Sequence, residues 1–214
     1  MKAVLVNYNF TPDWLKDYPE IDYYIYDRSD SKDFLKDFDQ SKIRYTENLG
    51  QVDYDKLTYL VEFYDQLPEV FLWGKTNLFK YITKEEFDWI KNSTTLTPLL
   101  TKNHPTYIDR LGQVNYFDKG LYWERNLGMD GHFAQFNYKY LVTFGEFAHE
   151  FQLPNPTYIP FAPGGNYILT REVVHKYSRD YYDKMRNCLS YCQLPREAQF
   201  VERAYYLMWG ENVL

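Results

Sequence analysis

Apolar and polar positions alternate along the first half of the chain in blocks that predict strands and helices in turn. Four apolar runs predict strands, at residues 3–8, 21–27, 42–48 and 69–74. Apolar residues at helical spacing between the last two runs predict a helix over residues 53–67, which Pro68 follows. This order indicates an α/β fold, with a central mixed sheet flanked by helices.

The second half begins irregularly and becomes regular again. Thr83 and Glu86 form a capping-box pair, which predicts a helix over residues 83–92. Mixed polarity from Thr94 to about Gly131 predicts long loops with short strands, one of them at residues 112–117. The remaining patterns predict a strand at residues 166–170 and helices at residues 134–151, 171–188 and 196–210.

Charge and hydropathy exclude two classes of partner. The net charge of -6 argues against nucleic acid, because binding to a phosphate backbone needs a basic surface. No run approaches the roughly 18 apolar residues of a membrane span. The apolar run at residues 3–6 is too short for a signal-peptide core, so we expect a cytoplasmic location.

Aromatic residues make up 20% of the chain, with 23 Tyr, 15 Phe and 5 Trp. Aromatic rings stack on sugar faces and on bases, so this composition suits carbohydrate or nucleotide ligands. The alternative is an aromatic core with no role in binding. Composition alone leaves both interpretations open.

Polar side chains follow three of the predicted strands: Asn7, Tyr8 and Asn9; Asp27 and Arg28; Lys75 and Asn77. Ligands of open α/β sheets bind beyond the carboxyl ends of the strands, so these residues form a candidate nucleotide site. The Gly-x-Gly-x-x-Gly and P-loop patterns are both absent, which argues against a dinucleotide fold or an ATP cradle of those types.

The segment "PGGNYILTREVV", which starts at Pro163, resembles the glycine-rich segment of nucleotide-sugar glycosyltransferases with the GT-A fold. The resemblance implies that Gly164 and Gly165, with Pro163 and Asn166, admit the donor sugar and the acceptor. It also implies an acidic catalytic base further along. Glu197 is the first candidate, on the inward stripe of the last predicted helix, and Glu202 is the second.

The order of short motifs resembles that of poorly characterised glycosyltransferase-like proteins from microbes and large DNA viruses, chlorella viruses among them. The matching motifs are Asn48 and Gly50, Tyr59-Leu60, residues 64–68, residues 71–74, Pro163–Gly165 and Glu202-Arg203. The resemblance implies a UDP-sugar donor and a glycan or glycoprotein acceptor. It also implies one GT-A-like domain over residues 1–214, with a nucleotide-binding half at 1–90 and an acceptor half at 91–214.

The chain departs from the GT-A pattern at the metal site. These enzymes typically carry Asp-x-Asp after the fourth strand, where this chain has "GKTN". The Asp-x-Asp from Asp53 to Asp55 is expected to cap a helix. Dependence on Mn²⁺ or Mg²⁺ is therefore open, and Lys75 is a candidate for the positive charge beside the diphosphate. A nucleotidyltransferase and a non-catalytic carbohydrate-binding or interaction protein with a degenerate site are the alternatives.

Overall fold

The structure is a computed structural model that describes residues 1–101, 107–108, 114–126 and 136–210. The strands are Lys2–Asn7 (β1), Asp22–Asp27 (β2), Ile43–Tyr45 (β3), Val70–Lys75 (β4), Thr97–Pro98 (β5), Tyr107–Ile108 (β6), Val114–Asp118 (β7), Leu121–Arg125 (β8), Tyr158–Phe161 (β9) and Tyr167–Thr170 (β10). The α-helices are Gln51–Glu62 (α1), Lys84–Ile90 (α2), Phe144–Glu150 (α4), Arg171–Val174 (α5), Arg179–Asn187 (α6) and Arg196–Trp209 (α7). Short 3₁₀ helices cover Asp13–Asp17 (η1), Lys32–Leu35 (η2), Gln40–Lys42 (η3), Tyr64–Gln66 (η4) and Leu78–Lys80 (η5).

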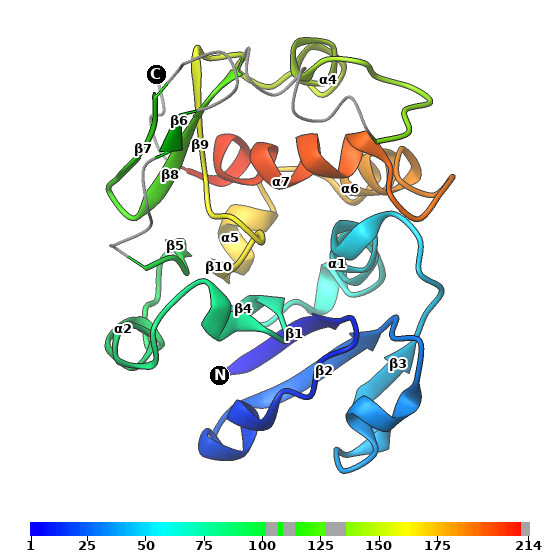
Figure 1. The fold of residues 1–214 in the computed structure, drawn as a ribbon, viewed down its shortest axis with the longest axis vertical. Helices are drawn as coiled ribbons and strands as arrows, with labels where there is room; N and C mark the ends of the chain where they lie inside the picture. The colour runs from blue at the N-terminus through cyan, green and yellow to red at the C-terminus, as the bar shows by residue number, and fades with distance from the viewer. Residues whose placement is uncertain (102–106, 109–113, 127–135, 211–214) are drawn as a thin grey trace.

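The larger sheet has the strand order β3-β2-β1-β4-β10-β5. Strand β1 lies parallel to both β2 and β4, with Leu5 opposite Ile25 on one side and Gly74 on the other. Strand β10 runs antiparallel to β4. The chain winds outward from β1 to β3 and then returns to the other side of β1, so the order reverses between β1 and β4 (Figure 1). The predicted α/β class with a mixed central sheet and flanking helices is confirmed.

A smaller antiparallel sheet has the order β6-β7-β8-β9 (Figure 1). Helix α7 lies between the two sheets. It packs along β9, and on its other side the ring centroids of Tyr205 and Trp209 lie 5.0 and 4.8 Å from that of Trp73 on β4. The second sheet is thus tied to the first through one helix with large aromatic side chains.

Both faces of the larger sheet are covered. Trp73 on β4 packs in the cluster that includes α1 and α7, whereas its neighbour Leu72 faces Leu78 and Phe87 on the opposite side. Aromatic rings fill much of both clusters, and Trp73 and Trp209 are fully buried. The aromatic-core interpretation therefore accounts for most of the rings.

Three helix predictions are wrong in extent. The helix predicted over residues 53–67 begins at Gln51 and ends at Glu62, and Tyr64–Gln66 form a 3₁₀ helix. Residues 171–188 form two helices, because Ser178 leaves the helical conformation and its side chain accepts the N–H of Tyr181 at 3.2 Å to cap α6. In the stretch predicted at 134–151, helix begins at Phe144 behind the capping residue Thr143. In the last two cases a local side-chain cap overrides the apolar period. Residues 134–135 and 112–113 lie outside the described ranges.

The other predicted elements are present. Helix α2 carries the predicted capping box of Thr83 and Glu86. Within the described ranges, no helix is both long and apolar enough to cross a lipid bilayer.

Candidate functional site

The carboxyl ends of β1, β2 and β4 bring three polar side chains into direct contact. Asn7 Nδ2 donates to Asp27 Oδ1 at 3.0 Å, and Thr76 Oγ1 donates to Asn7 Oδ1 at 2.5 Å. Ser29 also donates to Asp27 Oδ1, at 2.6 Å. We call these four residues the edge cluster. Its members are held by one another, whereas Asp27 Oδ2 is buried without a hydrogen-bond partner.

Tyr8 and Asn9 lie at the rim of the edge cluster. The Tyr8 side chain is largely exposed, at 47%. Asn9 has a positive φ of 52° and exchanges hydrogen bonds with Asp30, donating Nδ2 to Oδ2 at 2.6 Å and accepting the backbone N–H at 2.9 Å. The loops after β1 and β2 are therefore fixed to each other, with the Tyr8 ring at the surface.

Arg28 faces the protein interior. Its Nε donates to Asn48 Oδ1 at 2.9 Å and its Nη2 to the Leu49 carbonyl at 2.6 Å, while Nη1 lies 3.5 Å from Asp55 Oδ2. The side chains of Arg28 and Asp55 are each 1% exposed. Burial raises the pKa of Asp55 to about 7, although Arg28 favours the charged carboxylate. The prediction that Arg28 contacts a nucleotide is corrected: it joins the loop before α1 to the sheet.

Lys75 is the last residue of β4, and Asn77 follows it at the same edge. The half-buried Lys75 places its Nζ 3.4 Å from the Tyr81 hydroxyl oxygen. Burial opposes its charge, but Glu202 and Tyr81 outweigh that effect and raise the pKa of Lys75. Asn77 precedes η5, and its Oδ1 is buried without a hydrogen-bond partner. Lys75 therefore joins the edge cluster to the charges beneath the glycine pair.

The glycine pair forms a tight turn between β9 and β10. Gly164 and Gly165 have φ of 84° and 61°, and the N–H of Gly165 donates to the Ala162 carbonyl at 2.8 Å. Pro163 occupies the second position of this turn, as is common before a glycine with positive φ. Asn166 Oδ1 accepts the N–H of Lys75 at 2.8 Å and so fixes the turn to β4.

The space beside both glycines is filled by the protein itself. A Cβ added at Gly164 would lie 2.8 Å from Tyr81 Cζ, and one at Gly165 would lie 2.8 Å from Lys56 Nζ. The prediction that the glycines leave room for a sugar is therefore corrected. They are required by the positive φ and by close packing against side chains of this chain.

A group of charged and aromatic residues beneath the turn holds it in place. Lys56 is fully buried, and its Nζ donates to the carbonyls of Gly164 and Gly165 at 3.0 and 2.7 Å. Glu202 Oε1 accepts the N–H of Gly164. We call the whole group the turn network; its members are Asp53, Lys56, Lys75, Glu202, Arg203 and Tyr205.

Charges in the turn network affect one another strongly. Burial lowers the pKa of Lys56 to about 8, although Asp53 favours the ammonium form. Burial raises the pKa of Asp53, whose Oδ1 accepts the Tyr205 hydroxyl at 2.9 Å. At Glu202 burial is outweighed by Arg203, Lys75 and Lys56, which lower its pKa. The turn network contains two acids, Asp53 and Glu202, and three bases, Lys56, Lys75 and Arg203, so most of the charge is compensated inside the network.

Glu197 holds a loop. Its Oε1 accepts the backbone N–H groups of Lys139, Tyr140 and Leu141 at 3.2, 2.9 and 3.2 Å, and its Oε2 accepts the Tyr191 hydroxyl at 2.5 Å. The residue is fully buried. The prediction of an inward side chain at the start of α7 is correct, but the prediction of a catalytic base is corrected because both oxygens are committed to the protein.

Glu202 also differs from its predicted role. Besides Gly164, it binds Arg203, whose Nη1 donates to Oε2 at 2.8 Å. Five helical positions separate it from Glu197, which turns the two side chains about 140° apart around α7. The two glutamates therefore serve different places, and neither lies beside the edge cluster as a free base.

Sequence reasoning missed Lys56 and misplaced Asp53. Gly50 is the N-cap of α1, and Asp53 lies inside the helix, buried against Tyr205. One signal was available: Asp53, Lys56 and Leu57 share a helix face, so the lysine and the aspartate fall on the apolar side. A charged pair on the inward face of a helix predicts a buried ionic contact.

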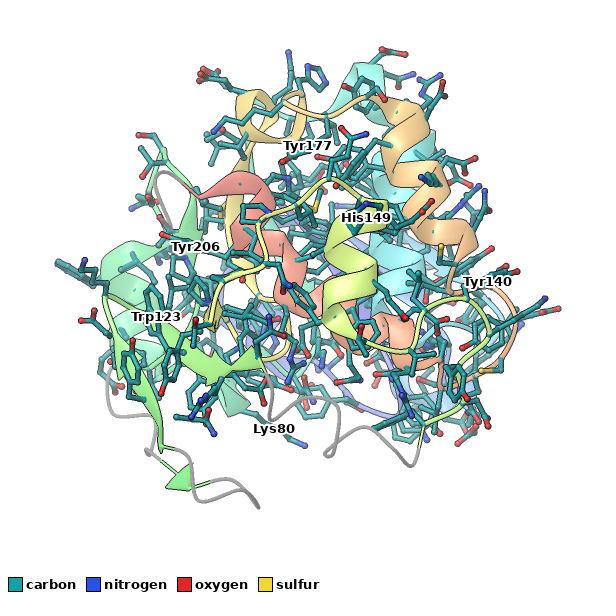
Figure 2. The ribbon with its side chains drawn as sticks, turned by 90° about the horizontal axis from the view of Figure 1, so that it is seen from above. Lys80, Trp123, Tyr140, His149, Tyr177 and Tyr206 are labelled. Atoms are coloured by element: carbon teal, nitrogen blue, oxygen red, sulfur yellow. The ribbon has the colours of Figure 1, made fainter. Side chains whose placement is uncertain are left out.

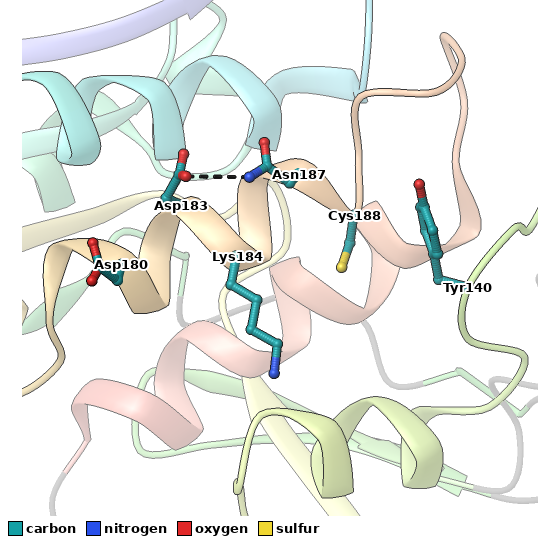
Figure 3. Close-up of a pocket in the computed structure, with 6 residues that line it drawn as sticks. All are labelled: Tyr140, Asp180, Asp183, Lys184, Asn187 and Cys188. Atoms are coloured by element: carbon teal, nitrogen blue, oxygen red, sulfur yellow. Dashed lines mark hydrogen bonds between the residues drawn. The ribbon is translucent and has the colours of Figure 1, made fainter.

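Four surface pockets lined by residues that the structure describes lie away from the edge cluster and the turn network. Figure 3 shows one of about 440 Å³ between α6 and the segment that carries Tyr140. Charged and amide side chains are among its lining residues, and Asn187 Nδ2 donates to Asp183 Oδ2 there at 3.2 Å. Over the part of the chain that the structure describes, there is no group of three or more His, Cys, Asp or Glu side chains suited to a metal ion.

Comparisons with protein-family models, with curated proteins and with solved structures find no match for this chain.

Proposed function

We propose that this chain is a GT-A-type glycosyltransferase that binds a nucleotide diphosphate sugar, with UDP as the nucleotide, and transfers the sugar to a hydroxyl of a saccharide or glycoconjugate. The observation that supports this best is the reversal of strand order between β1 and β4. In doubly wound sheets, ligands bind at such a reversal, outside the carboxyl ends of the strands. The edge cluster and Lys75 lie at these ends.

Individual residues then take roles that fit their surroundings. Asp27 has a buried oxygen without a partner, which suits a ribose hydroxyl or a uracil N–H that enters the edge cluster from the rim at Tyr8. The exposed Tyr8 ring is placed to stack on the base. Lys75 supplies positive charge for the diphosphate, as a point charge rather than a bidentate group. Asn77 adds an amide beside it.

Two features of the typical GT-A site are left out of the proposal. Strand β4 ends at Lys75, and Thr76 and Asn77 follow it. An ammonium group in this position does not fit a divalent cation. We therefore derive no step that uses a metal. The proposal assigns donor binding and no catalytic base, since Glu197 and Glu202 are both committed to the protein. The cytoplasm is the compartment proposed for the reaction.

Ligand-induced stabilisation tests the proposal. Thermal unfolding is measured with UDP, UDP-glucose, UDP-N-acetylglucosamine, GDP-mannose and UTP, each with and without Mn²⁺. A ligand at 100 times its Kd adds about 2.7 kcal/mol, which for a chain of this size raises the Tm by about 5–10 °C. We expect this rise with UDP and UDP-sugars.

Matched lysine variants locate the site. Lys75→Met is expected to lose the response to UDP, whereas Lys80→Met, on the exposed surface of η5, keeps it. The Tm of each variant without ligand separates lost binding from lost stability. A response to UTP alone would favour a nucleotidyltransferase, and no response to any of the five compounds would refute the proposal.

A further inference from the structure

The second sheet presents different side chains on its two faces. In the register of β7, β8 and β9, Tyr116 pairs with Trp123, and Arg125 pairs with Tyr158. Alternation along the strands places Tyr116, Trp123 and Tyr158 on one face. Tyr122 and Phe161 occupy the opposite face and are buried. The face with Tyr116 thus points away from the core.

Three aromatic rings lie against one another on this outer face. The ring planes of Tyr116 and Trp123 are 3° from parallel, with centroids 5.9 Å apart. The Tyr158 centroid lies 5.5 Å from that of Tyr116. Tyr116 is 36% exposed, and the other two are partly exposed. Figure 2 shows Trp123 on the second sheet at the side of the molecule.

The charges around the rings favour an uncharged ligand. Asp118 lies on the same strand face as Tyr116. Burial raises the pKa of Tyr116, and the nearby charge of Asp118 adds to this effect. Arg125 lies two residues after Trp123 and on the same face. One acid and one base beside the rings leave no excess charge. The net charge of -6 also disfavours a polyanion such as single-stranded nucleic acid. A sugar chain matches this surface, because its C–H faces stack on rings and its hydroxyls bond to charged groups at the rim.

We propose that Tyr116, Trp123 and Tyr158 form a platform that binds a neutral oligosaccharide. Strand β9 runs from Tyr158 to Phe161, about 10 Å, and the turn that contains Gly164 begins at the next residue. Glu124, on the buried face of the same sheet, binds Arg203 Nε at 2.8 Å and so connects the sheet to the turn network. If the proposed transferase function holds, the platform anchors the distal part of an extended glycan acceptor; the binding itself does not depend on that function.

Saccharide binding is tested without any nucleotide. Maltohexaose, cellohexaose, chitohexaose, mannohexaose and xylohexaose are titrated into the protein by calorimetry. Wild type is expected to bind at least one of them. Trp123→Ala is expected to lose at least about tenfold in affinity, because stacking on a large ring supplies much of the contact energy. Trp89→Ala changes the other exposed tryptophan, 76% exposed on α2, and is expected to bind as wild type does.

A second variant guards against loss of folding. Tyr116→Ala removes a more exposed ring, and urea unfolding of each variant shows whether the fold is intact. Binding of none of the five hexasaccharides, or equal binding by wild type and a folded Trp123→Ala, would overturn the proposal. Dimer formation that Trp123→Ala abolishes, without saccharide binding, would mean that the face contacts a second protein copy instead. Failure here leaves the UDP result unaffected, since the two titrations share no ligand.

Discussion

Replacing Lys56 by methionine tests whether the turn network holds the Gly164–Gly165 turn. The substitution keeps the length of the side chain and removes the ammonium group, which donates to the two glycine carbonyls at 3.0 and 2.7 Å. It also removes the positive charge that most favours the carboxylate form of Asp53, which is 2% exposed. Leaving two buried carbonyls without their donor costs about 1–3 kcal/mol each, so we expect a total loss of about 3–5 kcal/mol. That is a large part of the roughly 5–15 kcal/mol that stabilises a typical domain.

Urea unfolding followed by tryptophan fluorescence measures this loss. For a slope of about 2–3 kcal/mol per M, the midpoint should fall by about 1–2 M. Lys80→Met, at an exposed position, should change stability by less than about 0.5 kcal/mol. The double variant Asp53→Asn/Lys56→Met should lose at least about 1 kcal/mol less than the sum of the single losses, because it leaves no unpaired charge.

The pH dependence of the same variant provides a second check. Burial raises the pKa of Asp53, so at low pH the carboxyl is protonated and needs no positive partner. The loss caused by Lys56→Met should therefore be smaller at pH 4 than at pH 7, where Lys56 is still mostly charged. A loss below about 1 kcal/mol at pH 7, or one equal to that of Lys80→Met, would refute the assignment of a buried ammonium group that orders the turn.

Three further predictions follow from the other contacts. Gly164→Ala should destabilise the protein by at least about 1 kcal/mol more than Gly120→Ala does, as measured by urea unfolding. Both glycines have positive φ, but the nearest atom to an added Cβ lies at 2.6 Å at Gly164 and at 3.7 Å at Gly120. Equal losses of stability would contradict the close packing at Gly164. Burial raises the pKa of Asp55 to about 7 in the folded state, from about 3.9 in the unfolded state, so its contribution to stability should fall as pH rises between these values. Asp55→Asn should therefore flatten the profile of unfolding free energy against pH. An unchanged profile would argue against a buried neutral carboxyl. Glu197→Ala should lose about 2–3 kcal/mol of stability, because three backbone N–H groups lose their acceptor. Its affinity for UDP should stay within about twofold of wild type. Weaker UDP binding at unchanged stability would indicate that Glu197 contacts the ligand.

The amino-acid sequence determined the layered α/β arrangement and most of its elements. Apolar runs specified β1, β2 and β4 because a strand buried on both faces needs apolar side chains at successive positions. The Thr83 and Glu86 pair specified the start of α2, since a capping box depends on residues three positions apart. Such signals are local, and they survive folding unless another local signal is stronger, as at Ser178.

Tertiary structure decided what the candidate site residues do. A carboxylate at the start of a helix has the same sequence signature whether it faces a ligand or a loop; only the position of residues 139–141 shows that Glu197 binds backbone N–H groups. The glycine pair likewise requires a positive φ in either case, but only packing shows that Lys56 and Tyr81 fill the adjacent space. Contacts between residues far apart in the chain depend on how helices and strands pack, and short sequence patterns carry no information about that packing.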